Sequence, residues 1–273
     1  MNWHKWLINP VLEKEFRLRM RTFRAPLTVF FYLLVMSLFA LGYLYLRIVG
    51  SGAGMIRTND SREFFYFICG VQMVLIAFMA PGLTAGVISG EREKQTLNML
   101  LTTRQSSATI ILSKLVASLG FMTLMVVSTA PIYSVAFLYG GVSPWQFVST
   151  FLFYLFTMLV LGSIGVFFST LLKRTMVSVI VTYGVVLAMF GFTAMLALFL
   201  ELTFQRGPVP GLVLSLNPMA ALFDLFDPEL SRQALWRGSN IAMWHLNVGF
   251  YAVLAGLLLW VAIRKLRPSA GRR

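Results

Sequence analysis

The sequence predicts an all-α integral membrane protein with six transmembrane helices. Five stretches contain no Asp, Glu, Lys or Arg, and each is long enough to cross a bilayer: residues 25–46, 64–90, 115–172, 175–200 and 238–263. A spanning helix needs about 20 apolar residues, so the third stretch holds two. The run Gly140-Gly141-Val142-Ser143-Pro144 is a turn signal that separates them.

The remaining elements are connections within a single transmembrane domain, residues 1–273. A helix is expected over 10–24 before the first span, and a short helix over about 92–103 between spans two and three. Residues 202–244 form an external segment between spans five and six. The expected spans lie at about 25–47, 64–90, 113–139, 145–172, 175–201 and 245–264.

The positions of Lys and Arg orient the spans. With the N-terminus in the cytoplasm, 17 of the 23 cations lie on the cytoplasmic side. Asp and Glu show no such bias, so the asymmetry belongs to the cations, as the positive-inside rule expects. Both termini are therefore predicted to be cytoplasmic, and we expect the protein in a prokaryotic cytoplasmic membrane.

The net charge of +13 does not indicate nucleic-acid binding. The cations are dispersed along the cytoplasmic ends of helices, where they face anionic lipid headgroups. Membrane lipids are thus expected partners and nucleic acids are not. The single cysteine, Cys69, lies within the second span and cannot form a disulfide within the chain.

Catalytic and metal-binding motifs are missing from the sequence. There is no HExxH, GxSxG or GxxxxGK[ST] motif, and His4 and His245 are not placed to share a metal. No charged residue lies inside a span except near the ends, which argues against a carrier driven by an ion gradient. We therefore expect no catalytic residue and no metal site, and any uphill transport must draw energy from a partner.

The segment 10–24 predicts a basic amphipathic helix, with Asn9 as cap and Pro10 at the first position. One face is apolar, and a cationic stripe lies beside it. The stripe comprises Lys14, Arg17, Arg21 and Arg24. Such a helix lies in the membrane interface. It is either a surface anchor alone or a helix that also contacts a cytoplasmic partner.

The segment 89–114 begins with mixed charge at Glu91, Arg92 and Glu93 and continues with Leu97, Leu100 and Leu101. The leucines give a short apolar face, which suits either the lipid surface or a groove on a partner. Glu91 is expected to need a cation, because an unpaired charge near the bilayer is expensive. The cationic stripe of the segment 10–24 is the expected source.

Two motifs resemble permease subunits of ABC-2 type exporters. They are Asn-Pro-Val-Leu-x-Lys-Glu-Phe-Arg-x-Arg-x-Arg from residue 9 and Gly-Glu-Arg-Glu-x-x-Thr-Leu-x-x-Leu-Leu-Thr-Thr from residue 90. The resemblance extends over the whole chain, including the order of its spans. The family often has glycine before Thr96 and proline near position 104, where this chain has Gln95 and Arg104.

The resemblance implies an ATP-driven exporter that works by alternating access. Residues 10–24 would be its elbow helix and 92–103 a coupling helix seated in a separate ABC ATPase subunit. ATP and Mg²⁺ would bind that subunit, present in two copies, and this chain would hold no cofactor. A second copy or a related permease completes the membrane part. The expected ATPase-coupling residues are Glu91, Arg92, Glu93, Thr96, Leu97, Leu100 and Leu101.

Two other functions are left open by the residues. One is an ABC-2-like membrane subunit that does not transport and serves as a sensor or scaffold. The other is an intramembrane enzyme, which the missing motifs disfavour. Substrate-stimulated ATP hydrolysis separates an exporter from a scaffold.

Spans two and five are rich in Met and Phe, and the resemblance places a substrate path between them. The expected lining residues are Phe78, Met79, Met189, Phe190 and Met195, although ordinary packing explains such residues equally well. Pro81 and Pro131 are expected to interrupt their spans. The spacing of Gly82, Gly86 and Gly90 predicts close approach of another helix.

Proline and glycine divide the external segment into pieces too short to span. Residues 212–216 and 220–226 are expected to form short helices that dip into the outer leaflet, and a surface helix is expected from Asp227 to Trp236. Backbone groups in such a segment must be buried against protein or face water. We expect it to form a lid that contacts a partner protomer.

Overall fold

The structure, a computed structural model, describes residues 23–51, 58–96, 106–138, 140–203, 209–227 and 242–266. All regular secondary structure in these ranges is helical. Six of the helical runs are long and apolar enough to cross a membrane. The prediction of an all-α membrane protein with six spans is confirmed. Most of the predicted elbow helix, 10–24, lies outside the described residues, and so do Lys14, Arg17 and Arg21.

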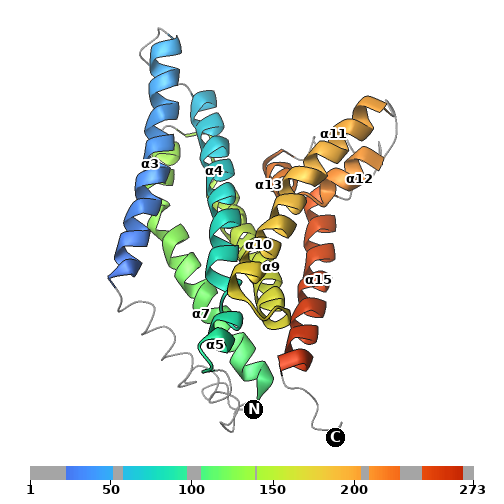
Figure 1. Cartoon of the computed structure of the whole chain (residues 1–273). Helices are drawn as coiled ribbons and strands as arrows, with labels where there is room; N and C mark the ends of the chain where they lie inside the picture. The colour runs from blue at the N-terminus through green and yellow to red at the C-terminus, as the bar shows by residue number, and fades with distance from the viewer. Residues whose placement is uncertain are drawn as a thin grey trace, which may run out of the picture.

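The spans are α3, α4 with α5, α7 with α8, α9, α10 with η1 and α11, and α15 (Figure 1). The outer helices α12 and α13 are each too short to span alone, and they form a pair that is long and apolar enough together but is bent by 97°. The bounds are α3 (Arg24–Ser51), α4 (Thr58–Thr84), α5 (Ser89–Glu93), α7 (Ser107–Ser128), α8 (Ala130–Leu138), α9 (Pro144–Leu171), α10 (Thr175–Leu187), the π-helical turn η1 (Ala188–Phe192), α11 (Thr193–Thr203), α12 (Val209–Ser215), α13 (Pro218–Phe226) and α15 (Met243–Leu266).

Local signals in the sequence set several helix ends. The Ser106 side chain accepts a hydrogen bond from the Thr109 N–H and caps α7. Ser143 and Gln146 form a capping box before α9, with Pro144 at its start. Gly140 has a φ of 74°, a conformation that glycine adopts without strain. The structure thus has a turn between spans three and four at the predicted position.

The prolines act differently from each other. Pro131 follows a break at Thr129, whose N–H and hydroxyl both donate to the Val126 carbonyl. The predicted interruption at Pro81 is wrong in position, because α4 continues through Pro81 to Thr84. The chain leaves the helix only at residues 85–88. At this break, side chains of neighbouring helices form hydrogen bonds with the backbone, as described below. The break therefore falls where these hydrogen-bond partners lie.

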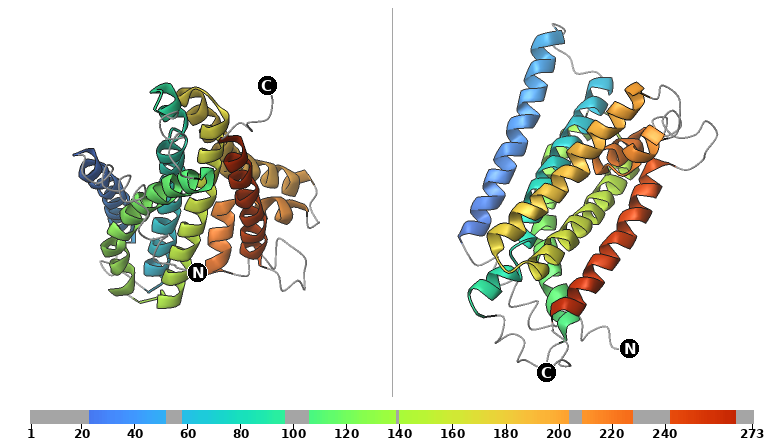
Figure 2. Two further views of the ribbon diagram at one scale, coloured as in Figure 1. Left: turned by 90° about the horizontal axis from the view of Figure 1, so that it is seen from below. Right: turned by 45° about the vertical axis from the view of Figure 1, so that its right-hand side comes forward.

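The helix α9 lies in the centre of the bundle and packs against α4, α7, α10, α13 and α15. The helix α3 lies at one edge, against α4 and α7, and α15 lies toward the other (Figures 1 and 2). The end that carries α5 and the start of α7 is called the inner end, following the predicted orientation. The helices α12 and α13 lie at the opposite, outer end (Figure 1).

Glycines set the closest helix contacts. A Cβ on Gly165 would lie 3.2 Å from the backbone nitrogen of Ala85, so α9 passes directly against the end of α4. The predicted glycine stripe of span two faces α10. A Cβ on Gly86 would lie 3.1 Å from Cγ2 of Thr175, and one on Gly82 would lie 3.3 Å from the Tyr183 hydroxyl. Glycine thus lets three helices meet at the inner end.

Candidate functional site

The inner corner between α4 and α5 is held by serine side chains from two other helices. Residues 85–88 form a turn, so their backbone groups need partners outside the helix. Ser169 Oγ of α9 accepts hydrogen bonds from Ile88 N at 2.8 Å and Ser89 N at 3.0 Å. Ser178 Oγ of α10 donates to the Ala85 carbonyl at 2.7 Å. This break in span two is therefore built into the packing of α9 and α10.

The three charges that follow each contact a different helix. Glu91 Oε1 accepts a hydrogen bond from Lys114 Nζ of α7 at 2.5 Å. The Lys114 side chain is only 3% exposed, whereas that of Glu91 is partly exposed. The expectation that Glu91 needs a cation is met by Lys114. A contact of Glu91 with Arg17 or Arg21 lies outside the described residues.

Arg92 binds the inner end of α9. Its guanidinium donates to the carbonyl of Thr170 at 3.1 Å and to that of Leu172 at 3.3 Å. The last carbonyls of a helix have no partner within it and carry partial negative charge. A forked cation suits them, so Arg92 acts as a cap for α9.

Glu93 binds the inner end of α10, where the helix dipole favours an anion. Its Oε1 accepts from Thr175 N and its Oε2 from Thr175 Oγ1, both at 2.8 Å. Glu93 is the last residue of α5, at the inner end of span two, and its side chain is exposed.

The helix α5 ends in a Schellman motif. Gln95 N donates to the Arg92 carbonyl at 3.1 Å and Thr96 N to the Glu91 carbonyl at 3.0 Å. Gln95 takes the left-handed conformation, with φ 56°, which glycine adopts most easily. This accounts for the glycine that the resembling permeases often have before Thr96.

The predicted start of the coupling helix is wrong. Arg92 and Glu93 belong to α5, which ends there, and the Schellman motif turns the chain away at Lys94 and Gln95. Thr96 is not helical, and its hydroxyl donates to the Glu91 carbonyl. The predicted residues Leu97, Leu100 and Leu101 lie outside the described residues.

Two of the five predicted substrate-path residues line one cavity. A cavity of about 190 Å³ between α4 and α10–η1 is lined by Phe78 and Phe190, together with Val74, Ala77, Tyr183, Val186, Leu187 and Gly191. Tyr183 donates from its hydroxyl to the Phe78 carbonyl at 2.7 Å and so joins the two helices. Sequence reasoning missed Tyr183, since nothing marks a lone tyrosine in an apolar span.

The other three predicted path residues do not line that cavity. Met189 is buried in the core and Met79 packs against it. Met195 of α11 is exposed. Successive side chains on a helix point about 100° apart. The span on which a residue lies therefore does not determine whether its side chain faces the other span.

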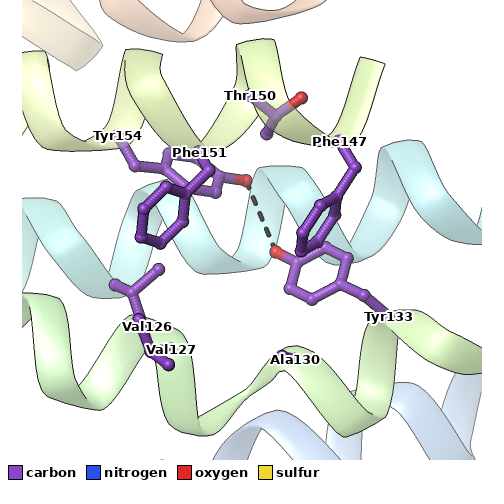
Figure 3. A pocket seen from close by; sticks show the side chains of 8 residues that line it. All are labelled: Val126, Val127, Ala130, Tyr133, Phe147, Thr150, Phe151 and Tyr154. Atoms are coloured by element: carbon purple, nitrogen blue, oxygen red, sulfur yellow. Dashed lines mark hydrogen bonds between the residues drawn. The ribbon is translucent and has the colours of Figure 1, made fainter. Parts of the chain in front are cut away.

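A second cavity of about 190 Å³ lies between the α7–α8 break and α9 (Figure 3). Val126, Val127, Ala130, Phe147 and Phe151 make most of its wall apolar. Tyr133 and Tyr154 face each other across it with their hydroxyl oxygens 3.5 Å apart, and Tyr154 donates to the Cys69 carbonyl. No residue of this cavity was predicted as a site.

The two short external helices are confirmed as α12 and α13. Asn217 lies between them and caps α13, with Oδ1 accepting from Met219 N and Ala220 N. From α15, Asn247 donates to the Ser215 carbonyl at 2.8 Å and Tyr251 to the Leu216 carbonyl at 2.6 Å. Most of the surface helix predicted from Asp227 to Trp236 lies outside the described residues.

Within the described ranges, no three His, Cys, Asp or Glu side chains lie close enough together to hold a metal ion. Comparison with curated proteins finds no similar sequence. Residues 9–264 match the family described as ABC-2 family transporter protein. The match covers nearly all of the chain, including every described span. The chain is therefore an integral membrane permease component of the ABC-2 transporter family.

Proposed function

We propose that the chain is the permease of an ATP-driven exporter, moved by a separate ABC ATPase that binds the segment 97–103. Two ATPase copies carry ATP and Mg²⁺, and a second permease copy or a related permease completes the membrane part. ATP binding closes the ATPases, displaces the bound segments and rocks the two membrane halves. The substrate then leaves toward the outer side.

One observation carries this proposal. Glu91, Arg92 and Glu93 contact α7, α9 and α10, one helix each. Only Lys94, Gln95 and Thr96 separate them from the segment with the coupling leucines, so a displacement of that segment would reach three spans. A loop that only rested on the lipid surface would not need its three charges fixed to two helix ends and a buried lysine.

The cavity between α4 and η1 supports a path for apolar or aromatic-rich substrate. Its wall combines Phe78 and Phe190 with aliphatic side chains, the composition that ligand pockets share. We infer that it is one part of the substrate path, and that the exposed faces of α10 and α11 border the rest.

Two substitutions test the ATPase contact. Leu100→Asp and Leu101→Asp should leave the permease in the membrane but release the ATPase or abolish substrate-stimulated ATP hydrolysis. Leu202→Asp is the matched control, because Leu202 is an exposed leucine at the outer end of α11. Copurification and ATP hydrolysis are measured for all three.

The outcomes separate the alternatives. A double leucine variant that copurifies with its ATPase and keeps full stimulated hydrolysis contradicts the proposed contact. A wild-type complex whose ATP hydrolysis responds to no transported compound is a sensor or scaffold and not an exporter.

A further inference from the structure

Span five is bound at its inner end and near its middle by residues of other elements. At the inner end, Glu93 holds the start of α10. Near its middle, the span contains the π-helical turn η1. A π-helical turn bonds residues five apart and commonly marks a functional site. Its altered bonding makes carbonyl oxygens available to partners outside the helix.

Asn217 uses that turn. Its Nδ2 donates to the Phe190 carbonyl at 2.7 Å and to Thr193 Oγ1 at 3.0 Å, while its Oδ1 caps α13. The amide has two N–H donors and two acceptor positions, and all four are engaged. Asn217 is 2% exposed, so losing either pair of bonds would leave buried polar groups unsatisfied.

The two halves of the outer pair differ in how they are attached to span five. The helix α12 packs closely on α11, from which only residues 204–208 separate it in sequence. In contrast, α13 packs on α4, α9 and α15 as well as on η1. Phe226 at its end stacks on Tyr66 of α4 with ring centroids 4.7 Å apart. Without the hydrogen bonds of Asn217, α13 would be held mainly by its packing on α4, α9 and α15 and not by span five.

We propose that span five carries motion from the inner corner to α13, and that Asn217 is the positioning residue that makes α13 follow it. This rests on the proposed function, because the motion starts at the ATPase-bound segment. Glu93 delivers it to α10, η1 passes it to Asn217, and α13 moves as the closing element of the outer end. The residues of the cavity at η1 lie between the two attachment points, so substrate there feels the same displacement.

The test uses single cysteines in a Cys69→Ala background, in full-length permease bound to its copurifying ATPase in nanodiscs. One reports on the inner end of α10, at Met176, which is 79% exposed. One reports on α12, at Leu212, which is 42% exposed. The third is Ala220→Cys on α13. The reaction rate with a water-soluble maleimide is measured without nucleotide and after trapping with ATP and vanadate.

The decisive variant is Asn217→Ser. Serine caps a helix about as well as asparagine but does not supply the two N–H donors to η1. We expect the nucleotide response to stay at positions 176 and 212 and to be lost at 220. Asn217→Asp, which also lacks the donors, should give the same pattern. Asn247→Ser is the matched control: it removes a bond to the Ser215 carbonyl on the α15 side and should leave all three responses.

The proposal is overturned if Asn217→Ser keeps the full response at 220, or if it removes the response at 176 as well. A failure of the proposed function looks different. In that case no ATPase copurifies, or the unsubstituted complex shows no nucleotide response even at position 176.

Discussion

Replacing Gly165 by alanine should force α9 away from α4 at the inner corner. The added Cβ would overlap Oγ1 of Thr84 and would lie 2.9 Å from Cβ of Thr84 and 3.2 Å from the Ala85 nitrogen. Two of these atoms move only with the backbone. The Thr84 hydroxyl is held as well, since it donates to the Ala80 carbonyl at 2.6 Å. The clash can therefore be relieved only by moving a helix.

The expected loss follows from overpacking a closely fitted contact. Such substitutions destabilise by about 1–3 kcal/mol, and the present clash involves backbone, so we expect about 2–3 kcal/mol. For a chain of this size, each kcal/mol lowers Tm by roughly 2–4 °C. Gly165→Ala should therefore lower Tm by about 4–12 °C, measured by intrinsic tryptophan fluorescence of the purified protein in one detergent.

The control is Gly184→Ala in α10, where a Cβ meets no atom within 4 Å. It should leave Tm unchanged or raise it, because alanine favours a helix more than glycine does. Adding Thr84→Gly to Gly165→Ala removes both atoms that lie closer than 3.0 Å and should recover part of the loss. If Gly165→Ala is as stable as Gly184→Ala, the close contact of α4 and α9 is not present in the protein.

Three further predictions concern the inner corner. Arg92→Gln removes two charge-assisted bonds, each worth about 1.5–3 kcal/mol, and should lower Tm by several degrees, with Arg92→Lys intermediate; equal values for all three proteins would exclude the capping role. Gln95→Gly relieves a left-handed conformation that costs about 1–2 kcal/mol, so Tm should stay level or rise, and a clear drop would contradict the φ of Gln95. Glu91→Lys and Lys114→Glu should each reduce ATPase binding in a pull-down, and the double variant should bind more ATPase than either single variant. A double variant that binds less ATPase than both single variants argues against the ion pair.

The sequence predicted the six spans because the bilayer is a uniform solvent that each span meets separately. Length and apolarity of one contiguous segment suffice for such a prediction. The same holds for the turn at residues 140–144 and for the two short helices on either side of Asn217, whose signals lie within a few residues. The glycine stripe of span two also predicted a close contact correctly, without naming α10 as its partner.

The candidate site depended on pairings between distant residues. Glu91 meets a lysine 23 residues away, and Arg92 and Glu93 bind helix ends 80 and 82 residues away. Sequence reasoning named these charges among the ATPase-coupling residues, which stays a prediction, and it did not foresee that all three bind groups of the membrane part. The sequence indicated that these charges need partners, because a charge at a span end is expensive to leave unpaired. It did not indicate which partners, because any nearby cation or helix end could pair with them.

The sequence by itself thus determined what crosses the membrane, and the tertiary structure decided what touches what. Any of the apolar spans can face lipid, so apolarity does not determine how they are arranged around α9. Small features such as Gly165 and Gly86 set that arrangement. Those glycines bring Ser169, Thr175 and α5 together. Only their combined packing places a partner within hydrogen-bonding distance of each charge: the Lys114 side chain for Glu91 and a helix end for Arg92 and for Glu93.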